Sequence, residues 1–226
     1  MIKALIFDLD GTIIDTETAW FVSFRQAYEK YGVNLTLDLY SQCIGTNLNN
    51  FDPYEYLITE MKLPIDRKQF RQSIKLRYSQ LMEKEKVRLG ILEYLEAART
   101  SGIKIGLASS SSREWVDKYL DQLGIRHYFE CIRTSDDVEN VKPDPELYLQ
   151  TLECLGVKAE EAIAIEDSPN GSLAAAAAGM HCIVTPNEIT KSLEFDPAFY
   201  RVDNLIDIDF GILISELFTK KTDLKA

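Results

Sequence analysis

The side chains in this sequence that could do chemistry together are four carboxylates, one lysine and one hydroxyl, each in a segment that follows an apolar run. They are Asp8, Asp10, Ser109, Lys142, Glu166 and Asp167. Acids that share a site raise one another's pKa unless a cation lies among them, and oxygen ligands suit a hard ion such as Mg²⁺. A lysine and a hydroxyl beside Mg²⁺ indicate a site for a phosphoryl group. The sequence offers no cysteine, histidine or activated serine as a nucleophile, so the nucleophile is expected to be a carboxylate, which would form an acyl phosphate.

The segments that must position these groups are predicted to be parallel strands. Apolar runs without alternation at residues 2–7, 103–108, 162–165 and 181–185, and a weaker run at 131–134, are typical of strands buried on both faces. Helical patterns separate these runs, as in Glu114–Leu123, where apolar residues repeat every 3.6 positions. We therefore expect an α/β fold with a doubly wound, Rossmann-like parallel sheet, whose ligands bind beyond the carboxyl ends of the strands.

Residues 15–88 break this alternation and predict an all-helical domain inserted directly after the first strand. Trp20, Phe24 and Tyr28 lie on one apolar stripe, and residues 70–85 have the pattern of a long helix with a polar face. We expect residues 1–14 and 89–226 to form the α/β core domain. In the helical domain, Trp20 and the loop residue Thr46 are candidates for substrate contacts, although packing is an equal alternative for Trp20.

The composition argues against several other classes of protein. The 226 residues include 36 acidic and 25 basic side chains, a net charge of −11, which disfavours nucleic acid or an anionic membrane as the main partner. No apolar run approaches the ~20 residues of a membrane span, so we expect a cytoplasmic protein, either a monomer or a homodimer. The two histidines lack the spacing of a zinc hydrolase. The four cysteines are predicted to be small buried residues in a reducing compartment.

Four motifs give the sequence a resemblance to a known family. Asp8-Leu9-Asp10-Gly11-Thr12, Ser109, Lys142-Pro143 and Glu166-Asp167 reproduce, in order, the motifs of the haloacid dehalogenase superfamily. The helical insertion is similar to the α-helical C1-type cap of that superfamily, near the beta-phosphoglucomutase and phosphoglycolate phosphatase branch. The resemblance covers residues 1 to about 215 and implies the same core and cap.

The resemblance implies a role for each acidic residue. Asp8 would be the nucleophile that attacks phosphorus. Asp10 would be the general acid for the leaving group and then the base for water. Asp8, Asp167 and the backbone carbonyl of Asp10 would hold Mg²⁺, with Glu166 as a further ligand or as a neighbour of the ligands.

The resemblance also implies that Ser109 and Lys142 bind the transferring phosphoryl group. Ser110 is a second candidate for contact with the substrate. Capping of the following helix is the simpler role for Ser110, Ser111 and Ser112. Lys142 could instead be a solvated turn residue before a proline.

The first motif has two alternative interpretations, a plain turn or a calcium loop. An EF-hand loop that starts at Asp8 would need a glutamate at position 19, where Ala19 stands. The other three motifs also favour the phosphoryl-transfer interpretation over a turn.

The leading functional hypothesis is a Mg²⁺-dependent phosphatase that acts on a small phosphorylated metabolite, in particular a sugar phosphate. A beta-phosphoglucomutase-type phosphomutase is the main alternative. That branch has a histidine and an arginine in the cap where this sequence, counted without gaps, has Trp20 and Leu48. A haloacid dehalogenase lacks the second aspartate, here Asp10. A non-catalytic phospho-receiver or Mg²⁺-binding module lacks a ~70-residue cap that walls off solvent.

Overall fold

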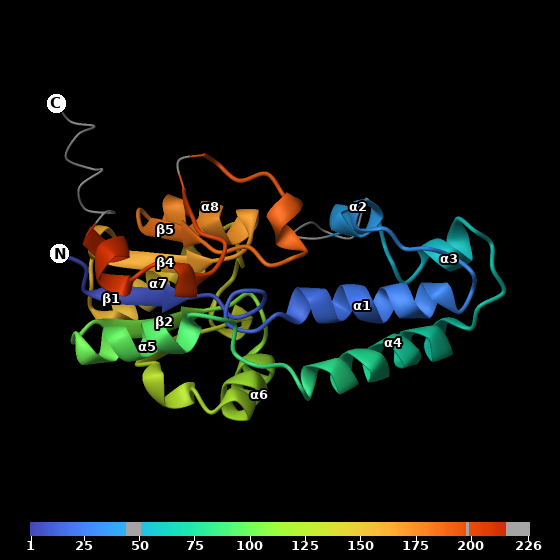
Figure 1. The fold of residues 1–226 in the computed structure, drawn as a ribbon, viewed down its shortest axis with the longest axis horizontal. Helices are drawn as coiled ribbons and strands as arrows, with labels where there is room; N and C mark the ends of the chain where they lie inside the picture. Colours follow the sequence, from blue (N-terminus) through green and yellow to red (C-terminus); the bar gives the residue numbers. More distant parts are fainter. Residues whose placement is uncertain (44–50, 198, 216–226) are drawn as a thin grey trace.

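A parallel six-stranded sheet lies at the centre of the computed structural model, which describes residues 1–43, 51–197 and 199–215. The strand order is β3-β2-β1-β4-β5-β6, and every pair of neighbouring strands is parallel. Figure 1 labels the four central strands β2, β1, β4 and β5. The strands are β1 (Ala4–Phe7), β2 (Lys104–Ala108), β3 (Cys131–Arg133), β4 (Ala162–Glu166), β5 (His181–Val184) and β6 (Tyr200–Arg201). The first five agree with the predicted strands to within two residues, and the two-residue β6 is not predicted.

Helices cover both faces of the sheet, as the predicted alternation requires. On one face, larger side chains such as Phe7 and Leu107 pack against α5 (Ile91–Thr100) and α6 (Arg113–Leu123). On the other face, small side chains such as Ala164 lie under α7 (Glu146–Leu155) and α8 (Pro169–Ala177). Figure 1 shows α8 above the sheet and α5 below it. The fold is the predicted doubly wound α/β arrangement.

The described residues between β1 and α5 form helices, as the sequence predicts. These helices are α1 (Thr16–Glu29), α2 (Leu37–Tyr40), α3 (Tyr56–Thr59) and α4 (Arg67–Met82). Asp15 caps α1 and Asp66 caps α4, each by accepting a backbone N–H from the first turn. The long helices α1 and α4 lie side by side and extend away from the sheet (Figure 1).

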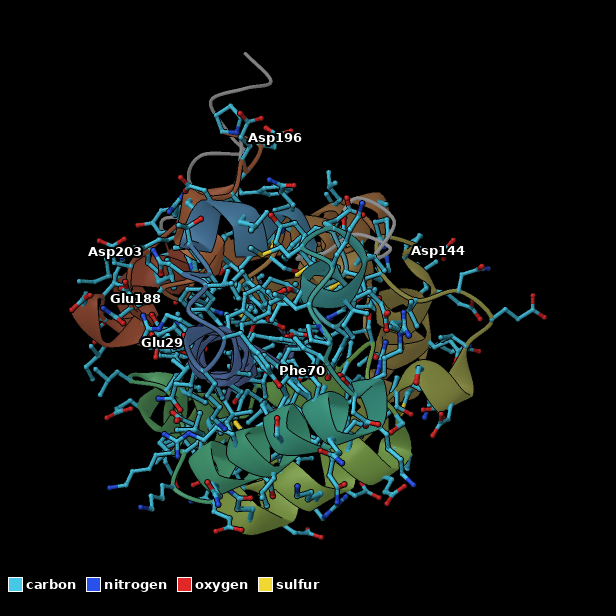
Figure 2. The ribbon with its side chains drawn as sticks, turned by 90° about the vertical axis from the view of Figure 1, so that its right-hand side faces the viewer. Glu29, Phe70, Asp144, Glu188, Asp196 and Asp203 are labelled. Carbon is cyan, nitrogen blue, oxygen red and sulfur yellow. A yellow bond between two sulfur atoms is a disulfide. The ribbon has the colours of Figure 1, made fainter. Side chains whose placement is uncertain are left out.

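A separate hydrophobic cluster holds these helices together. Phe24 and Tyr28 of α1 and Phe70 and Ile74 of α4 are among its buried members. Figure 2 looks toward this part of the molecule and labels Glu29 and Phe70, one on each long helix. The cluster gives the insertion a core of its own, apart from the two clusters on the faces of the sheet.

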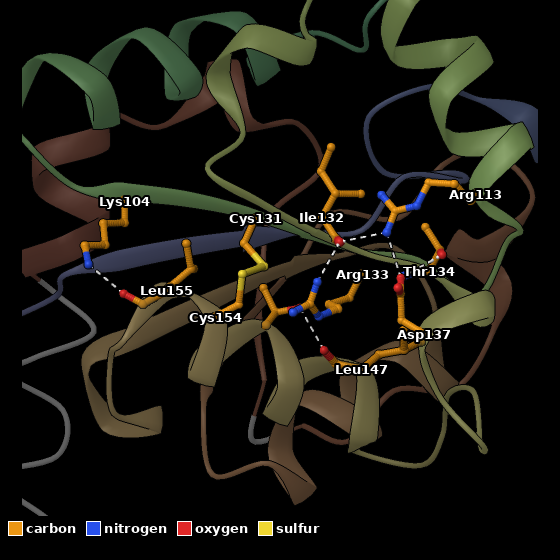
Figure 3. The surroundings of a disulfide bond; sticks show 11 residues. Lys104, Arg113, Cys131, Ile132, Arg133, Thr134, Asp137, Leu147, Cys154 and Leu155 are labelled. Atoms are coloured by element: carbon orange, nitrogen blue, oxygen red, sulfur yellow. Dashed lines mark hydrogen bonds and ion pairs between the residues drawn. A yellow bond between two sulfur atoms is a disulfide. The ribbon is translucent and has the colours of Figure 1, made fainter.

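The prediction for the cysteines is wrong for two of the four. Cys131 at the start of β3 and Cys154 on α7 form a disulfide, with Cα atoms 6.2 Å apart (Figure 3). Packing of α7 on β3 brings together two residues that are 23 positions apart in the sequence. Their spacing in the sequence does not predict that they lie close together. Cys43 and Cys182 are free thiols, and Cys182 is buried as predicted.

The helices give one further result. Within the described ranges, no helix is long and apolar enough to cross a membrane.

Candidate active site

The loop after β1 brings the first aspartates to the carboxyl edge of the sheet. Asp8 is 7% exposed, and its backbone N–H donates to the Ile165 carbonyl of β4. Gly11 has a φ of +85°, and a Cβ at this position would lie 2.2 Å from Asp167 Oδ2. Only glycine fits there, because any side chain would clash with that carboxylate in a left-handed backbone. The glycine of the first motif therefore lets two site loops touch.

Lys142 lies at the centre of the buried charges. Its Nζ is 2.6 Å from Asp8 Oδ1 and 2.7 Å from Glu166 Oε1, and it donates to the Ala108 carbonyl at 2.7 Å. An ammonium has three N–H donors, so these partners use all three. Tyr148 donates its hydroxyl to the same oxygen of Glu166. Glu166 is thus buried with two donors on one oxygen, one of them charged.

Three carboxylates converge beside this lysine. Asp8, Glu166 and Asp167 each offer an oxygen, and these atoms lie within 4.8 Å of one another. Burial raises the pKa of Asp8 to about 7; Lys142 opposes this shift, and Glu166 and Asp10 add to it. Burial also raises the pKa of Asp167 well above its usual range, helped by Asp8 and Glu166. Both pKa values are raised, as expected for buried acids when the single positive charge of Lys142 lies among three carboxylates.

This donor set fits a hard divalent cation. It consists of carboxylate oxygens, and burial together with the neighbouring acids raises two of their pKa values; a cation among them would neutralise that charge. Magnesium is the hard cation that commonly combines one or two carboxylates with substrate phosphate. The carboxylate of Asp10 is not part of this cluster, and the predicted contact through its backbone carbonyl stays a prediction.

Asp167 is oriented by residues that the sequence analysis missed. Asn187 Nδ2 donates to Asp167 Oδ2 at 2.9 Å, while its own Oδ1 accepts the backbone N–H groups of Ile189 and Thr190. Thr12 and Thr190 donate their hydroxyls to the same carboxylate at 3.3 Å. The side chains that orient a metal ligand strongly affect its affinity. Asn187 lies in the loop after β5, so inspection of the loop after every strand would have found it.

The serine run after β2 has divided roles. Ser109 is buried, and its Oγ accepts the N–H of Ser111; both Ser109 and Ser110 line the cavity above the carboxylates. Ser112 caps α6, as predicted. The capping role expected for Ser110 and Ser111 is wrong, because the cap of α6 is Ser112; the Ser111 hydroxyl instead donates to Asp10 Oδ2 at 2.7 Å.

That cavity has a volume of about 830 Å³. It has the size of a pocket for a small organic ligand. Its floor includes Asp8, Asp10, Lys142 and Asp167, and α1 contributes Thr16, Glu17 and Trp20 to its wall.

The predicted contacts in the insertion have different outcomes. Trp20 lines the cavity and also stacks on Tyr78, with ring centroids 3.9 Å apart, so both interpretations of this residue have support. Thr46 lies outside the described residues, and its expected substrate contact stays a prediction. Glu17, which the sequence analysis did not select, lies in the cavity wall, and burial raises its pKa to about 7.

The sequence matches a family model described as haloacid dehalogenase-like hydrolase over residues 5–185. The chain belongs to this family. The predicted membership and the assignment as a hydrolase are thus confirmed.

Relatives in this family are named as phosphatases. The YhcW protein of Bacillus subtilis, whose name carries a provisional phosphatase assignment, is 43% identical over 96% of this chain and 98% of its own. A protein of Thermotoga maritima named phosphorylated carbohydrates phosphatase is 34% identical over 80% of this chain and 83% of its own. The structure of a mutant of CbbY from Rhodobacter sphaeroides in complex with xylulose-1,5-bisphosphate superposes with a TM-score of 0.70. It is 28% identical, and the match covers 92% of this chain and 96% of that one.

Proposed function

We propose that this protein is a Mg²⁺-dependent phosphatase that hydrolyses a small phosphorylated metabolite, a sugar phosphate, through an aspartyl phosphate on Asp8. One observation carries the proposal. Lys142 holds Asp8 Oδ1 at 2.6 Å beside Glu166 and Asp167, on the floor of a cavity of about 830 Å³. The names of the Thermotoga maritima and Bacillus subtilis relatives support the reaction type.

In the first half of the reaction, a carboxylate oxygen of Asp8 forms a bond to phosphorus and the bond between phosphorus and the leaving oxygen breaks. Asp10 gives its proton to that leaving oxygen, which departs as an alcohol. Ser109 and Lys142 bind the transferring phosphoryl oxygens and offset their charge, and Lys142 does so by turning one N–H from one of its three present partners to a phosphoryl oxygen. Magnesium, held by Asp8, Asp167 and the Asp10 carbonyl with Glu166 beside them, would neutralise charge on the carboxylates and the phosphoryl group.

In the second half, a water oxygen attacks the same phosphorus and the bond from phosphorus to Asp8 breaks. The carboxylate of Asp10 takes the proton from the water, which restores the acid for the next turnover. The products are inorganic phosphate and the free carboxylate of Asp8, so atoms and protons balance over the cycle.

We further propose that residues 15–88 act as a cap domain on a core of residues 1–14 and 89–226. The position of α1 in the cavity wall supports this division, because it would let the insertion exclude bulk water during transfer. A sugar phosphate is favoured because the CbbY mutant was solved in complex with xylulose-1,5-bisphosphate and the Thermotoga relative is named for phosphorylated carbohydrates. We also propose that the protein is cytoplasmic and that it is a monomer or a homodimer.

The decisive experiment measures phosphate release from a panel of phosphorylated metabolites with Mg²⁺ or with EDTA. The panel includes β-glucose 1-phosphate with its bisphosphate activator. We expect Mg²⁺-dependent release from one or a few sugar phosphates. Asp8→Asn should abolish it, whereas Asp38→Asn, on the exposed surface of α2, should retain it.

The other outcomes each contradict the proposal in a different way. Isomerised hexose phosphate without free phosphate would identify a mutase. Neither release nor isomerisation would favour a Mg²⁺-binding module. Full activity of Asp8→Asn would exclude the aspartyl phosphate.

A further inference from the structure

An aromatic stack links the helical insertion to the core domain directly beside the site. Trp20 of α1 stacks on Tyr78 of α4, with centroids 3.9 Å apart and planes 15° apart. Tyr78 in turn stacks on Trp115 of α6, with centroids 5.8 Å apart and planes 18° apart. Tyr119 packs edge-on against the same Trp115 ring at 4.9 Å. The indole of Trp115 is therefore held between a residue of the insertion and a residue of the core.

That indole also makes the hydrogen bond that fixes one side of Asp10. Trp115 Nε1 donates to Asp10 Oδ1 at 2.9 Å, and Ser111 Oγ donates to Asp10 Oδ2 at 2.7 Å. Each carboxylate oxygen thus has its own donor, one from a side chain after β2 and one from α6. Hydrogen bonds to an ionised acceptor are among the stronger ones in proteins, so this pair sets the rotation of the carboxylate.

We propose that Trp115 is a positioning residue for Asp10, and that the stack of Trp20, Tyr78 and Trp115 makes the orientation of this acid/base group depend on where α1 and α4 lie. The proposal rests on the proposed function, in which Asp10 exchanges protons with the leaving group and with water. It assigns Trp115 a role that packing alone does not require.

The two donors to Asp10, Trp115 and Ser111, differ in whether they can also accept a hydrogen bond. An indole N–H can only donate, whereas a serine hydroxyl can donate to a carboxylate and accept from a carboxylic acid. The bond from Trp115 therefore persists while Oδ1 carries no proton, and Ser111 accommodates either state of Oδ2.

The hydrogen bond can be tested without any activity. The chain has two tryptophans, Trp20 and Trp115, so ¹⁵N-labelled protein gives two indole N–H resonances. The variants Trp20→Phe and Trp115→Phe assign them. We expect Asp10→Ala to move the Trp115 resonance, and Tyr78→Leu to move it as well, because the first removes the acceptor and the second removes the stacking partner. A Trp115 resonance that stays in place in Asp10→Ala would overturn the proposal.

The positioning role is tested by comparing two leaving groups. The ratio kcat/KM reports the steps up to formation of the aspartyl phosphate, and a nitrophenolate leaves without needing a proton, unlike a sugar alkoxide. Trp115→Phe keeps an aromatic ring and removes the N–H donor. We expect it to lower kcat/KM for the sugar phosphate by roughly tenfold and to leave that for nitrophenyl phosphate within about twofold.

A neighbouring lysine offers the matched control. The Lys118 side chain is exposed, and its Nζ lies 5.9 Å from the centroid of the Trp115 ring, so Lys118→Gln should leave both ratios unchanged. Equal losses for the two substrates, or no loss for either, would overturn the positioning role. Wild-type protein that releases no phosphate from any compound would instead contradict the proposed function, while the indole resonance still decides whether Trp115 holds Asp10.

Discussion

Glu17 is a partly buried acid in the first turn of α1, at the wall of the cavity. Burial raises its pKa to about 7 from an ordinary 4.5, and the charges of Asp10 and Asp15 add to the shift. Between these two pH values the folded protein binds more protons at this site than the unfolded chain, so its stability falls as the pH rises through that window. Above pH 7 the ionised carboxylate costs up to about 3 kcal/mol.

Glu17→Gln should therefore raise the free energy of unfolding at pH 8 and change it little at pH 4. Urea unfolding in buffer free of divalent cations measures both values. The exposed Glu83→Gln is the matched control and should show no such pH dependence. A stability difference for Glu17→Gln that is the same at both pH values would contradict the assigned cause.

At the residue scale, the sequence predicted the groups that lie in recognisable motifs at the ends of strands or in the segments that follow them. Asp8, Lys142, Glu166 and Asp167 meet at one edge because parallel strands end there together. The partners of these groups were missed because they reach the site through packing. Trp115 projects from a helix whose 3.6-residue period marks it only as an apolar position, and nothing local shows that its N–H meets Asp10.

Hydrophobic periodicity and helix-capping residues predicted the helices and strands but not the cross-link between them. Strands without alternation indicated the parallel sheet, and the run of Ser110, Ser111 and Ser112 indicated the start of α6, where Ser112 is the residue that caps it. The disulfide between Cys131 of β3 and Cys154 of α7 depends on how a helix packs across a strand, which the sequence does not reveal. The disulfide joins β3, the strand with the weakest sequence pattern, to α7, the helix that follows Lys142.

Removing this cross-link should destabilise the protein. The chain-entropy model assigns roughly 3 kcal/mol to a closed loop of 23 residues, because the bond restricts the unfolded chain. The double variant Cys131→Ala/Cys154→Ala should unfold at lower temperature than the wild type. Dithiothreitol should lower the melting temperature of the wild type and leave that of the variant unchanged. Four reactive thiols in unreduced, denatured wild-type protein, in place of two, would contradict the disulfide.

On the scale of the whole molecule, the chain leaves the core after β1 and returns to it at one point. Ile14 and Val87 pair in an isolated antiparallel bridge, and the next residue, Arg88, donates its backbone N–H to the Ile13 carbonyl. The Arg88 guanidinium donates to the carbonyls of Gly11, Thr185 and Pro186, the last two at 2.9 Å. One side chain thus ties the returning chain to the loop after β1 and to the loop after β5.

Arg88→Met should therefore weaken both stability and catalysis. It keeps much of the apolar stem but leaves several carbonyls without their donor, at a cost of about 2–4 kcal/mol in the free energy of unfolding. The loops freed in this way carry Asp8 and Asn187, so kcat should fall and the Mg²⁺ concentration for half-maximal activity should rise. Arg99→Met is the matched control, since it breaks only a solvent-exposed ion pair with Glu96, and such pairs contribute little to stability. Stability loss with an unchanged Mg²⁺ requirement would show that Arg88 supports the fold without shaping the site, because the metal ligands would then keep their places when the two loops are no longer tied together.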